Sequence, residues 1–320
     1  MTAVAALFGE ELPLIKKMRQ AVEGALEGKH EAVELALAAL LARGHLLIED
    51  VPGVGKTTLA RALAHAVGGE LRRVQFTSDL LPSDVVGVSV YDQRNAEFVL
   101  RHGPIFANVL LADEINRASP RTQSALLEAM NEAQVSIDGQ TIPLPDPFFV
   151  IATQNPQDFA GTFPLPESQL DRFILRVRIG YPPPHVEMRL LLEGNSDTAR
   201  NVPVVLDPSH LVALQRQVDR VAIDNSLLSY LHLIIHATRT SSALSLGAST
   251  RGAMALSKAA RARALLRGRG YCIADDIHDL AVPVLAHRIR VAAHDGGFAP
   301  SRDEAEDAVR NIVARIPVPL

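Results

Sequence analysis

The chain contains 320 residues, with a mass of 34.5 kDa and a formal net charge of −4 at pH 7. At about 150 residues per domain this length predicts two domains, and the slightly acidic balance gives no general reason to expect nucleic acid as a partner. The single cysteine, Cys272, excludes an intrachain disulfide framework. The most apolar long segment, residues 33–42, is far shorter than the ~20 residues that span a bilayer. No secretory signal is visible, so we expect a cytoplasmic protein without a membrane span.

The first part of the chain predicts helices on both sides of a short buried strand. Residues 10–25 and 31–42 carry apolar side chains at helical spacing. The apolar residues 45–49 predict a strand that runs directly into a glycine-containing loop, and residues 59–67 return to helical spacing. This order of strand, glycine-containing loop and helix is typical of a phosphate-binding unit.

Two further buried strands are predicted at residues 107–112 and 147–153, which are rich in apolar side chains. Between them, residues 134–142 alternate around Asp138-Gly139, a dipeptide that is typical of a tight hairpin turn. Buried strands separated by helices indicate a parallel sheet with crossover helices. The amino-terminal part of the chain therefore predicts the α/β class.

A stiff break at Tyr181-Pro182-Pro183-Pro184 separates this part from a helical one. Asp207-Pro208 fits the N-cap and the first position of a helix. Further helices are predicted at residues 226–239, 250–267, 274–292 and 303–315. We therefore assign residues 1–182 to an α/β core and residues 183–320 to a smaller all-α domain.

The loop after the first strand has the residue types that a bound triphosphate requires. Gly53 and Gly55 permit close approach of the backbone, and Lys56 would reach the β- and γ-phosphates. Thr57 would place its hydroxyl on Mg²⁺, while the helix that follows would direct its N-terminus at the phosphates. The residues that we expect to contact the nucleotide from this loop are Pro52, Gly53, Val54, Gly55, Lys56, Thr57 and Thr58.

Asp50 departs from the usual pattern of such a loop, because the strict motif has glycine five positions before the glycine of the Gly-Lys-Thr unit. Aspartate tolerates a positive φ better than most residues, so we expect the turn to survive. Its carboxylate also brings a negative charge close to a bound anion, which mildly opposes nucleotide binding. The strand before the loop and the helix after it favour a nucleotide-binding loop over a chance Gly-Lys-Thr turn.

Two carboxylates, Asp113 and Glu114, follow directly on the apolar residues 109–112. A buried strand that ends in this way delivers both groups to the carboxyl edge of the sheet, where ligands bind in open α/β folds. There Asp113 is suited to hold Mg²⁺ with its water shell, and Glu114 to polarise an attacking water. Asn155 leaves the next predicted strand and is suited to orient the same water. Taken alone, it would indicate an Asx turn before Pro156.

The distribution of charge in the helical part is uneven. Residues 225–274 contain no acidic side chain, and two interpretations are open: a solvated helix face, or a helix that presents one or two arginines to a polyphosphate. The basic residues of this stretch are Arg239, Arg251, Lys258, Arg261, Arg263, Arg267 and Arg269.

Several strings of sequence resemble the MoxR family of AAA+ ATPases. They are residues 44–49, 51–57, 75–84, 103–106, 113–117, 152–156 and 167–173. The Phe-Thr-x-Asp-Leu-Leu-Pro-Ser-Asp run at residues 76–84 discriminates better than the lysine loop and the acidic pair, which P-loop proteins share. The resemblance covers most of residues 20–182 and continues more weakly through the helical part.

The resemblance implies an AAA+ P-loop core with a parallel sheet, followed by a small helical lid. Residues 85–102 would be the insert in the second helix of this clade, which is related to magnesium chelatase motor subunits. The hairpin at residues 134–142 would precede sensor 1, so the resemblance makes Asn155 sensor 1.

Two arginines also receive roles from the resemblance. Arg172 would be the arginine finger offered to the nucleotide of a neighbouring subunit, with Arg117 and Arg121 as reserve candidates. The adjacent Asp171 leaves open a simple local ion pair for Arg172. Arg251 would be sensor 2 in the lid. The γ-phosphate would then bridge Lys56, Arg251 and the neighbour's Arg172.

The activity that the resemblance implies is hydrolysis of ATP to ADP and phosphate with Mg²⁺. Such proteins form ring homo-oligomers, usually hexamers, with chaperone-like roles in remodelling, maturation or metal insertion of protein complexes. They often work with partners that carry a von Willebrand factor A domain. Two other functions stay open. A nucleic-acid-associated AAA+ motor would need more basic and aromatic side chains than the insert at residues 85–102 offers, and only Asp50 supports a nucleotide-dependent scaffold without turnover.

Overall fold

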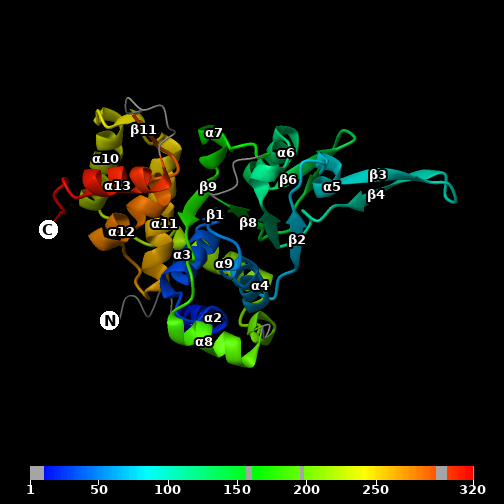
Figure 1. Cartoon of the computed structure of the whole chain (residues 1–320), viewed down its shortest axis with the longest axis horizontal. Coiled ribbons are helices and arrows are strands. Elements are labelled where there is room, and N and C mark those ends of the chain that lie inside the picture. Colours follow the sequence, from blue (N-terminus) through cyan, green and yellow to red (C-terminus); the bar gives the residue numbers. More distant parts are fainter. Residues whose placement is uncertain (1–10, 156–160, 195–197, 293–300, 320) are drawn as a thin grey trace.

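A computed structural model describes residues 11–155, 161–194, 198–292 and 301–319 (Figure 1). Its centre is a parallel five-stranded sheet with the strand order β2-β5-β8-β1-β9. The strands are β1 (His45–Glu49), β2 (Leu71–Gln75), β5 (Val109–Asp113), β8 (Phe149–Gln154) and β9 (Phe173–Val177). The sequence predicts the three central strands of this sheet but neither of the two edge strands.

The carboxyl ends of the central strands lie at one edge of the sheet. Ala112 of β5 pairs with Ala152 of β8, and Ala152 pairs with Leu47 of β1. The three strands therefore run in step and end together. We call this edge the carboxyl edge, where Glu49, Asp113 and Gln154 lie, and the opposite one the amino edge, where the strands begin.

Helices cover both faces of the sheet because successive strand residues point to opposite faces. Leu46 and Ile48 belong to one buried cluster, together with side chains of the amino-terminal helices, whereas Leu47 belongs to another. On the first face lie α2 (Glu11–Ala25), α3 (His30–Leu41) and α4 (Lys56–Ala66), and on the second lies α6 (Pro120–Glu132). Glu10, where the sequence predicts the start of the first helix, lies outside the described residues.

Two hairpins leave the core. The predicted hairpin around Asp138-Gly139 is confirmed as β6 (Gln134–Ile137) and β7 (Gln140–Pro143), with a positive φ at both turn residues. The segment that the sequence assigns to the insert contains the last two residues of α5 (Pro82–Val86) and a second hairpin, β3 (Gly87–Asp92) and β4 (Glu97–His102). This second hairpin projects from the end of the molecule opposite the lid (Figure 1).

Two short elements connect the core to the lid, α8 (Pro184–Glu193) and η2 (Thr198–Asn201). Two others lie inside the core: η1 (Ile115–Arg117) follows β5, and α7 (Glu167–Leu170) precedes β9. The backbone N–H groups of Val205 and Leu206 both donate to the carbonyl of Ala66, at the end of α4. The connecting segment thus returns to the core before the lid begins, and the boundary at residue 182 stays a prediction.

The lid is helical, as the sequence predicts. It contains α9 (Pro208–Val218), α10 (Asn225–Thr240), α11 (Thr250–Leu266), α12 (Ala274–Leu285) and α13 (Arg302–Val313). The Asp207 carboxylate accepts from the N–H of His210 at 2.9 Å, which confirms it as the N-cap of α9. None of the helices in the described ranges has both the length and the apolar character that crossing a bilayer would require.

The sequence prediction of one helix over residues 274–292 is wrong at its end. Helix α12 ends at Leu285, and β11 (Arg290–Val291) pairs with β10 (Leu244–Leu246) in a short antiparallel ribbon. Periodicity alone misses this end because the intervening residues leave the helix for contacts with the core. The lid is therefore not entirely α-helical.

A buried arginine holds the lid against the amino edge of the sheet. Arg288 is 4% exposed, and its Nε donates to Asp171 Oδ1 at 2.6 Å. Its Nη2 donates to the carbonyl of Phe173 at 2.7 Å, at the start of β9. The guanidinium loses most of its hydration in this position, and the carboxylate and carbonyls replace it. In the described part of the chain Asp171 pairs with Arg288, and the local ion pair with Arg172 that the sequence leaves open is not found.

Candidate active site

The lysine-containing loop at the end of β1 has the conformation that its glycines permit. Gly53 and Gly55 have φ values of 83° and 97°, a region that favours glycine. Helix α4 begins at Lys56, so Lys56, Thr57 and Thr58 form its first turn. A Cβ built on Gly53 would meet no atom within 4 Å. The backbone of this loop is therefore open to a ligand.

Lys56 lies at the same edge of the sheet as the two acidic residues. Its Nζ donates to the main-chain carbonyl of Asp50. Burial lowers the pKa of the Lys56 ammonium, and nearby carboxylates, among them those of Asp113 and Glu114, oppose that shift. The structure thus brings the ammonium and both carboxylates together, as the sequence predicts from separate strands.

Asp50 has a role that the sequence analysis does not predict. The turn survives with aspartate at this position, as expected, but the described residues with a positive φ do not include Asp50, so tolerance of that conformation is not the reason. Asp50 is 8% exposed, and its Oδ2 accepts from the N–H groups of Ile179 and Gly180, both at 2.7 Å. Its Oδ1 accepts from the N–H of Val51 at 2.8 Å. The carboxylate therefore joins the start of the loop to the segment that follows β9.

This arrangement predicts that glycine, the usual residue of the motif, is unfavourable at position 50. Asp50→Gly would leave two or three N–H groups without an acceptor, which we expect to lower the free energy of unfolding by about 1–3 kcal/mol. Asp50→Asn keeps one acceptor oxygen and should fall between Asp50→Gly and the parent. Urea unfolding measures the three proteins, and a glycine variant as stable as the parent would contradict this role.

Asp113 is held by two groups beside the loop. Thr153 of β8 donates its hydroxyl to Asp113 Oδ1 at 2.5 Å. Arg73 of the edge strand β2 approaches Asp113 Oδ2 with Nη2 at 2.6 Å and Nε at 3.2 Å. The Arg73 side chain is 52% exposed, whereas Asp113 is 16% exposed. A cation thus already lies on the carboxylate at which the sequence predicts Mg²⁺.

Glu114 is positioned by three partners and an unusual backbone conformation. Its N–H donates to Thr153 Oγ1 at 2.9 Å, and its Oε2 accepts from Gln75 Nε2 at 2.8 Å. Arg117 Nε lies 3.0 Å from the same oxygen. The φ of Glu114 is 55°, which is uncommon for a residue other than glycine. Sequence reasoning predicts Glu114 but misses Arg73, Gln75 and Thr153, because β2 is not predicted and only strand register reveals these contacts.

Asn155 also lies near the loop. It follows Gln154, whose carbonyl accepts from the N–H of Asp50 at 3.2 Å. Asn155 and Glu49 line a common cavity between the core and the lid. The carboxyl edge therefore carries Lys56, the acidic pair and this amide in one region.

The two arginines that the resemblance singles out lie elsewhere, at the amino edge. Arg172 immediately precedes β9, and its Nη1 donates to the carbonyl of Leu127 in α6. Arg251 donates to Asn131 near the end of the same helix. Burial lowers the pKa of Arg172, and the neighbouring Arg251 lowers it further. The two guanidiniums are thus close to each other.

This position corrects one expectation about the lid. The five residues of β1, at about 3.3 Å each, place the amino edge roughly 15 Å from the lysine loop. Arg251 therefore does not join Lys56 on a phosphate of the same chain, because the lid is docked at the other edge through Arg288. Of the reserve candidates, Arg117 pairs with Glu114 of its own chain, and Arg121 is exposed in the first turn of α6.

The residues at the carboxyl edge fit Mg·ATP. The loop offers an open backbone, an ammonium and the hydroxyl of Thr57 at the first turn of a helix, which is the donor set for polyphosphate. Asp113 offers the hard oxygen ligand that Mg²⁺ prefers, together with the Thr57 hydroxyl.

Comparisons with known proteins agree with this fold. Residues 45–175 match the family described as "ATPase family associated with various cellular activities (AAA)", and residues 236–312 match an AAA lid domain. The chain is 48% identical over 318 residues to the uncharacterised protein YeaC of Bacillus subtilis, and the match covers 98% of each protein. It is 41% identical over 277 residues to the chaperone MoxR1 of Mycobacterium tuberculosis, covering 84% of this chain and 73% of that protein.

A solved structure extends the similarity to nearly the whole chain. The crystal structure of a protein from Cytophaga hutchinsonii, assigned as an ATPase, superposes with a TM-score of 0.88 at 33% sequence identity. The superposition covers 98% of both chains, core and lid together. On its fold, its site and these relatives, the chain belongs to the MoxR family of AAA+ ATPases.

Proposed function

We propose that the protein hydrolyses Mg·ATP to ADP and phosphate at the carboxyl edge and uses the energy to remodel protein partners. The observation that supports this proposal most directly is the convergence of Lys56, Asp113 and Glu114 at one sheet edge, where the carboxylates oppose the burial shift in the lysine pKa. An ammonium for phosphate, a carboxylate for Mg²⁺ and a carboxylate for water are the groups that this reaction needs.

Each residue has a distinct task in the proposed reaction. Lys56 and the loop N–H groups of residues 52–58 bind the phosphates, and Thr57 and Asp113 would hold Mg²⁺, which neutralises charge on the triphosphate. Glu114 polarises the attacking water for in-line displacement at the γ-phosphate. Asn155 orients that water as sensor 1.

The apo contacts of the acidic pair must rearrange when nucleotide binds. Arg73 lies on Asp113, so binding of Mg²⁺ at that carboxylate displaces this guanidinium. Gln75 and Arg117 lie on the same oxygen of Glu114, Oε2, so this oxygen becomes available to water only when these donors move. Because Arg73 and Arg117 are 52% and 46% exposed, each can move into solvent.

The amino edge of one subunit would complete the site of its neighbour. Arg172 and Arg251 carry two adjacent positive charges that lie far from the lysine loop of their own chain. We therefore infer a homo-oligomeric ring, with a hexamer as the expected size, in which both arginines approach the γ-phosphate of the next subunit. A heterologous interface of this kind closes into a ring when its rotation closes.

The partners follow from the family and from one relative. The name of MoxR1 describes that protein as a chaperone, and we propose a chaperone-like role for this chain as well, in maturation, remodelling or metal insertion. A partner with a von Willebrand factor A domain and a cytoplasmic location remain part of this proposal.

The proposal predicts that Lys56→Ala weakens binding of Mg·ATP at the carboxyl edge and abolishes turnover. Removing the ammonium takes away a charge-assisted contact with phosphate, so we expect ATP affinity to fall at least about tenfold and phosphate release to become undetectable. Isothermal titration and a phosphate-release assay measure the two quantities. Lys258→Ala, an exposed lysine of α11, is the matched control and should behave as the parent. If the parent neither binds nor hydrolyses Mg·ATP, the proposed function is wrong.

A further inference from the structure

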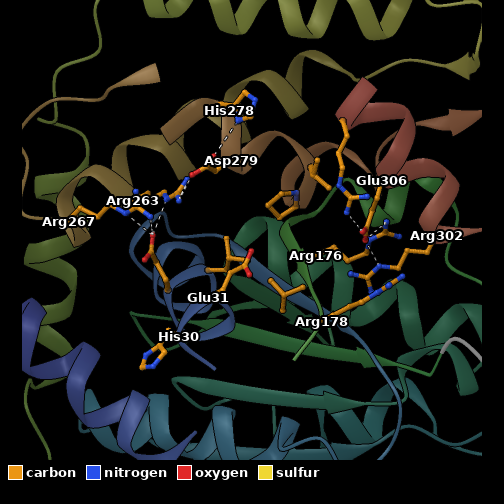
Figure 2. Close-up of a pocket in the computed structure, with 16 residues that line it drawn as sticks. His30, Glu31, Arg176, Arg178, Arg263, Arg267, His278, Asp279, Arg302 and Glu306 are labelled. Carbon is orange, nitrogen blue, oxygen red and sulfur yellow. Dashed lines mark hydrogen bonds and ion pairs between the residues drawn. The ribbon is translucent and has the colours of Figure 1, made fainter. Parts of the chain in front are cut away.

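An arginine-lined cavity of about 730 Å³ lies between the core and the lid, apart from the lysine loop (Figure 2). Its walls come from α3, the end of β9 and the lid helices α11, α12 and α13. Among the described residues, none of those at positions 50–58 lines it. We call it the core–lid pocket, and its six arginines are Arg176, Arg178, Arg263, Arg267, Arg302 and Arg310.

The buried carboxylates of the pocket are each shared by three guanidiniums. Glu34 is 12% exposed and lies 3.0 Å from both Arg263 and Arg267, with Arg19 at 3.5 Å. Arg263 also pairs with Asp279 at 2.7 Å, and Arg19 also pairs with Glu23 at 2.8 Å. The Asp279 side chain is 47% exposed, so water screens part of its charge, and among the described residues Arg267 shares its only buried carboxylate, Glu34, with Arg263.

The same arrangement recurs on the opposite side. Glu306 is 13% exposed and lies 2.7 Å from Arg302, 3.0 Å from Arg310 and 3.9 Å from Arg176. Glu49 supplements it, at 3.1 Å from Arg176. The other acidic partners on this side, Asp303 and Asp307, are 70% and 64% exposed, so water screens their charge.

Arg176 shows that the positive charge is not fully compensated. Its side chain is only 10% exposed, yet Nη2 has no hydrogen-bond partner among the described residues. Burial lowers the pKa of Arg176 to about 10, and the adjacent Arg302 contributes to this shift although Glu49 opposes it. A buried donor without an acceptor is unfavourable, so an anion at this point would be stabilised.

We propose that the core–lid pocket binds a compact anion with two or more linked phosphate groups, of the pyrophosphate or nucleoside-polyphosphate class. Figure 2 shows Arg263 and Arg267 on one side of the pocket and Arg176, Arg178 and Arg302 on the other. Two cationic groups on opposite walls suit two linked phosphates better than one, and guanidiniums bind phosphate oxygens in pairs. Asp279 and Glu31 also line the pocket and would exclude an anion from the parts nearest to them.

Such a ligand would connect the lid to the strand that leads to the lysine loop. Arg176 and Arg178 belong to the core, whereas the other four arginines belong to the lid. Arg302 also donates to the carbonyl of Glu49 at 2.6 Å, one residue before the loop begins. The anion would therefore hold core and lid together at a place adjacent to, but separate from, the proposed active site.

Titration calorimetry with inorganic pyrophosphate in magnesium-free buffer tests the proposal. All proteins carry Lys56→Ala, which removes the phosphate contact of the lysine loop. This protein is expected to bind one pyrophosphate. Adding Arg267→Gln and Arg310→Gln, which are 36% and 55% exposed, should weaken binding at least about tenfold. Adding Arg216→Gln and Arg220→Gln, two exposed arginines at the end of α9, removes the same charge and should leave binding unchanged.

Two further measurements decide the remaining cases. Orthophosphate should bind the Lys56→Ala protein more weakly than pyrophosphate does. If the ligand of the pocket is a nucleotide, ATP should bind the same protein at least as tightly as pyrophosphate. Thermal melting reports whether the variants fold, and Arg178→Gln, a 45% exposed position, replaces the double variant if that one unfolds. If Lys56→Ala alone removes pyrophosphate binding, or if the pocket variants bind as the α9 control does, the six arginines are only an ion-pair network between core and lid.

Discussion

Glu114→Gln is expected to bind Mg·ATP as tightly as the parent and to hydrolyse it about 10²–10⁴-fold more slowly. The amide keeps the size of the side chain and can still contact Gln75, which lies 2.8 Å from Glu114 Oε2. It cannot polarise water as a carboxylate does. Titration calorimetry measures binding, and phosphate release measures turnover.

The matched control for this variant is Glu70→Gln. Glu70 lies just before the amino end of β2, whereas Gln75, which contacts Glu114, lies at the carboxyl end of that strand. Glu70 pairs with the exposed Arg72. The Glu70→Gln variant should hydrolyse ATP at the parental rate. If Glu114→Gln also retains that rate, another group activates the water. If neither the parent nor the variant turns over bound ATP, the protein is a nucleotide-dependent scaffold.

Arg172→Ala is expected to reduce hydrolysis by about 10³-fold while each subunit still binds ATP. The reason is positional: Arg172 lies at the amino edge, beside Arg251 and away from the lysine loop of its own chain. The loss of hydrolysis should therefore occur at the nucleotide sites between subunits, where the arginine comes from the next subunit, and binding of ATP by each subunit should be unaffected. Phosphate release by the assembled protein measures the effect.

Mixing two inactive proteins separates this role from a structural one. In a ring assembled from equal amounts of Arg172→Ala and Glu114→Gln subunits, about a quarter of the interfaces combine an intact Glu114 with a neighbour's intact Arg172. Activity should reappear in the mixture, although neither component has it. Arg251→Ala should be rescued in the same way. Rescue of Arg121→Ala instead of Arg172→Ala would transfer the role to that reserve candidate.

The central part of the fold could be predicted because its strands are apolar throughout. The strands β1, β5 and β8 are buried for nearly their whole length, so each appears in the sequence as an apolar run. In contrast, β2 buries only Val74, and β9 is interrupted by Arg176. At an edge, solvent or a specific ion pair replaces the second neighbouring strand, so the apolar signal is lost.

The site could be predicted only in part, for a related reason. Strand–loop–helix order and the position of an acidic pair at a strand end are local features, so Lys56, Asp113 and Glu114 follow from the sequence. The contact of Arg73 with Asp113 depends on the register between strands. The location of Arg251 depends on how the lid docks through Arg288. These are long-range relations that a single sequence does not contain.

The bonds of Asp50 have a consequence for how the two parts of the chain can move. Its carboxylate holds the N–H groups of Ile179 and Gly180 to the start of the loop. Gly28 lies so close to Pro183 that a Cβ there would come within 2.5 Å of the proline ring. The chain therefore stays attached to the core through Pro183. If nucleotide moves the lid, we expect the hinge for that movement to lie beyond Pro183, because the chain up to this proline is held to the core.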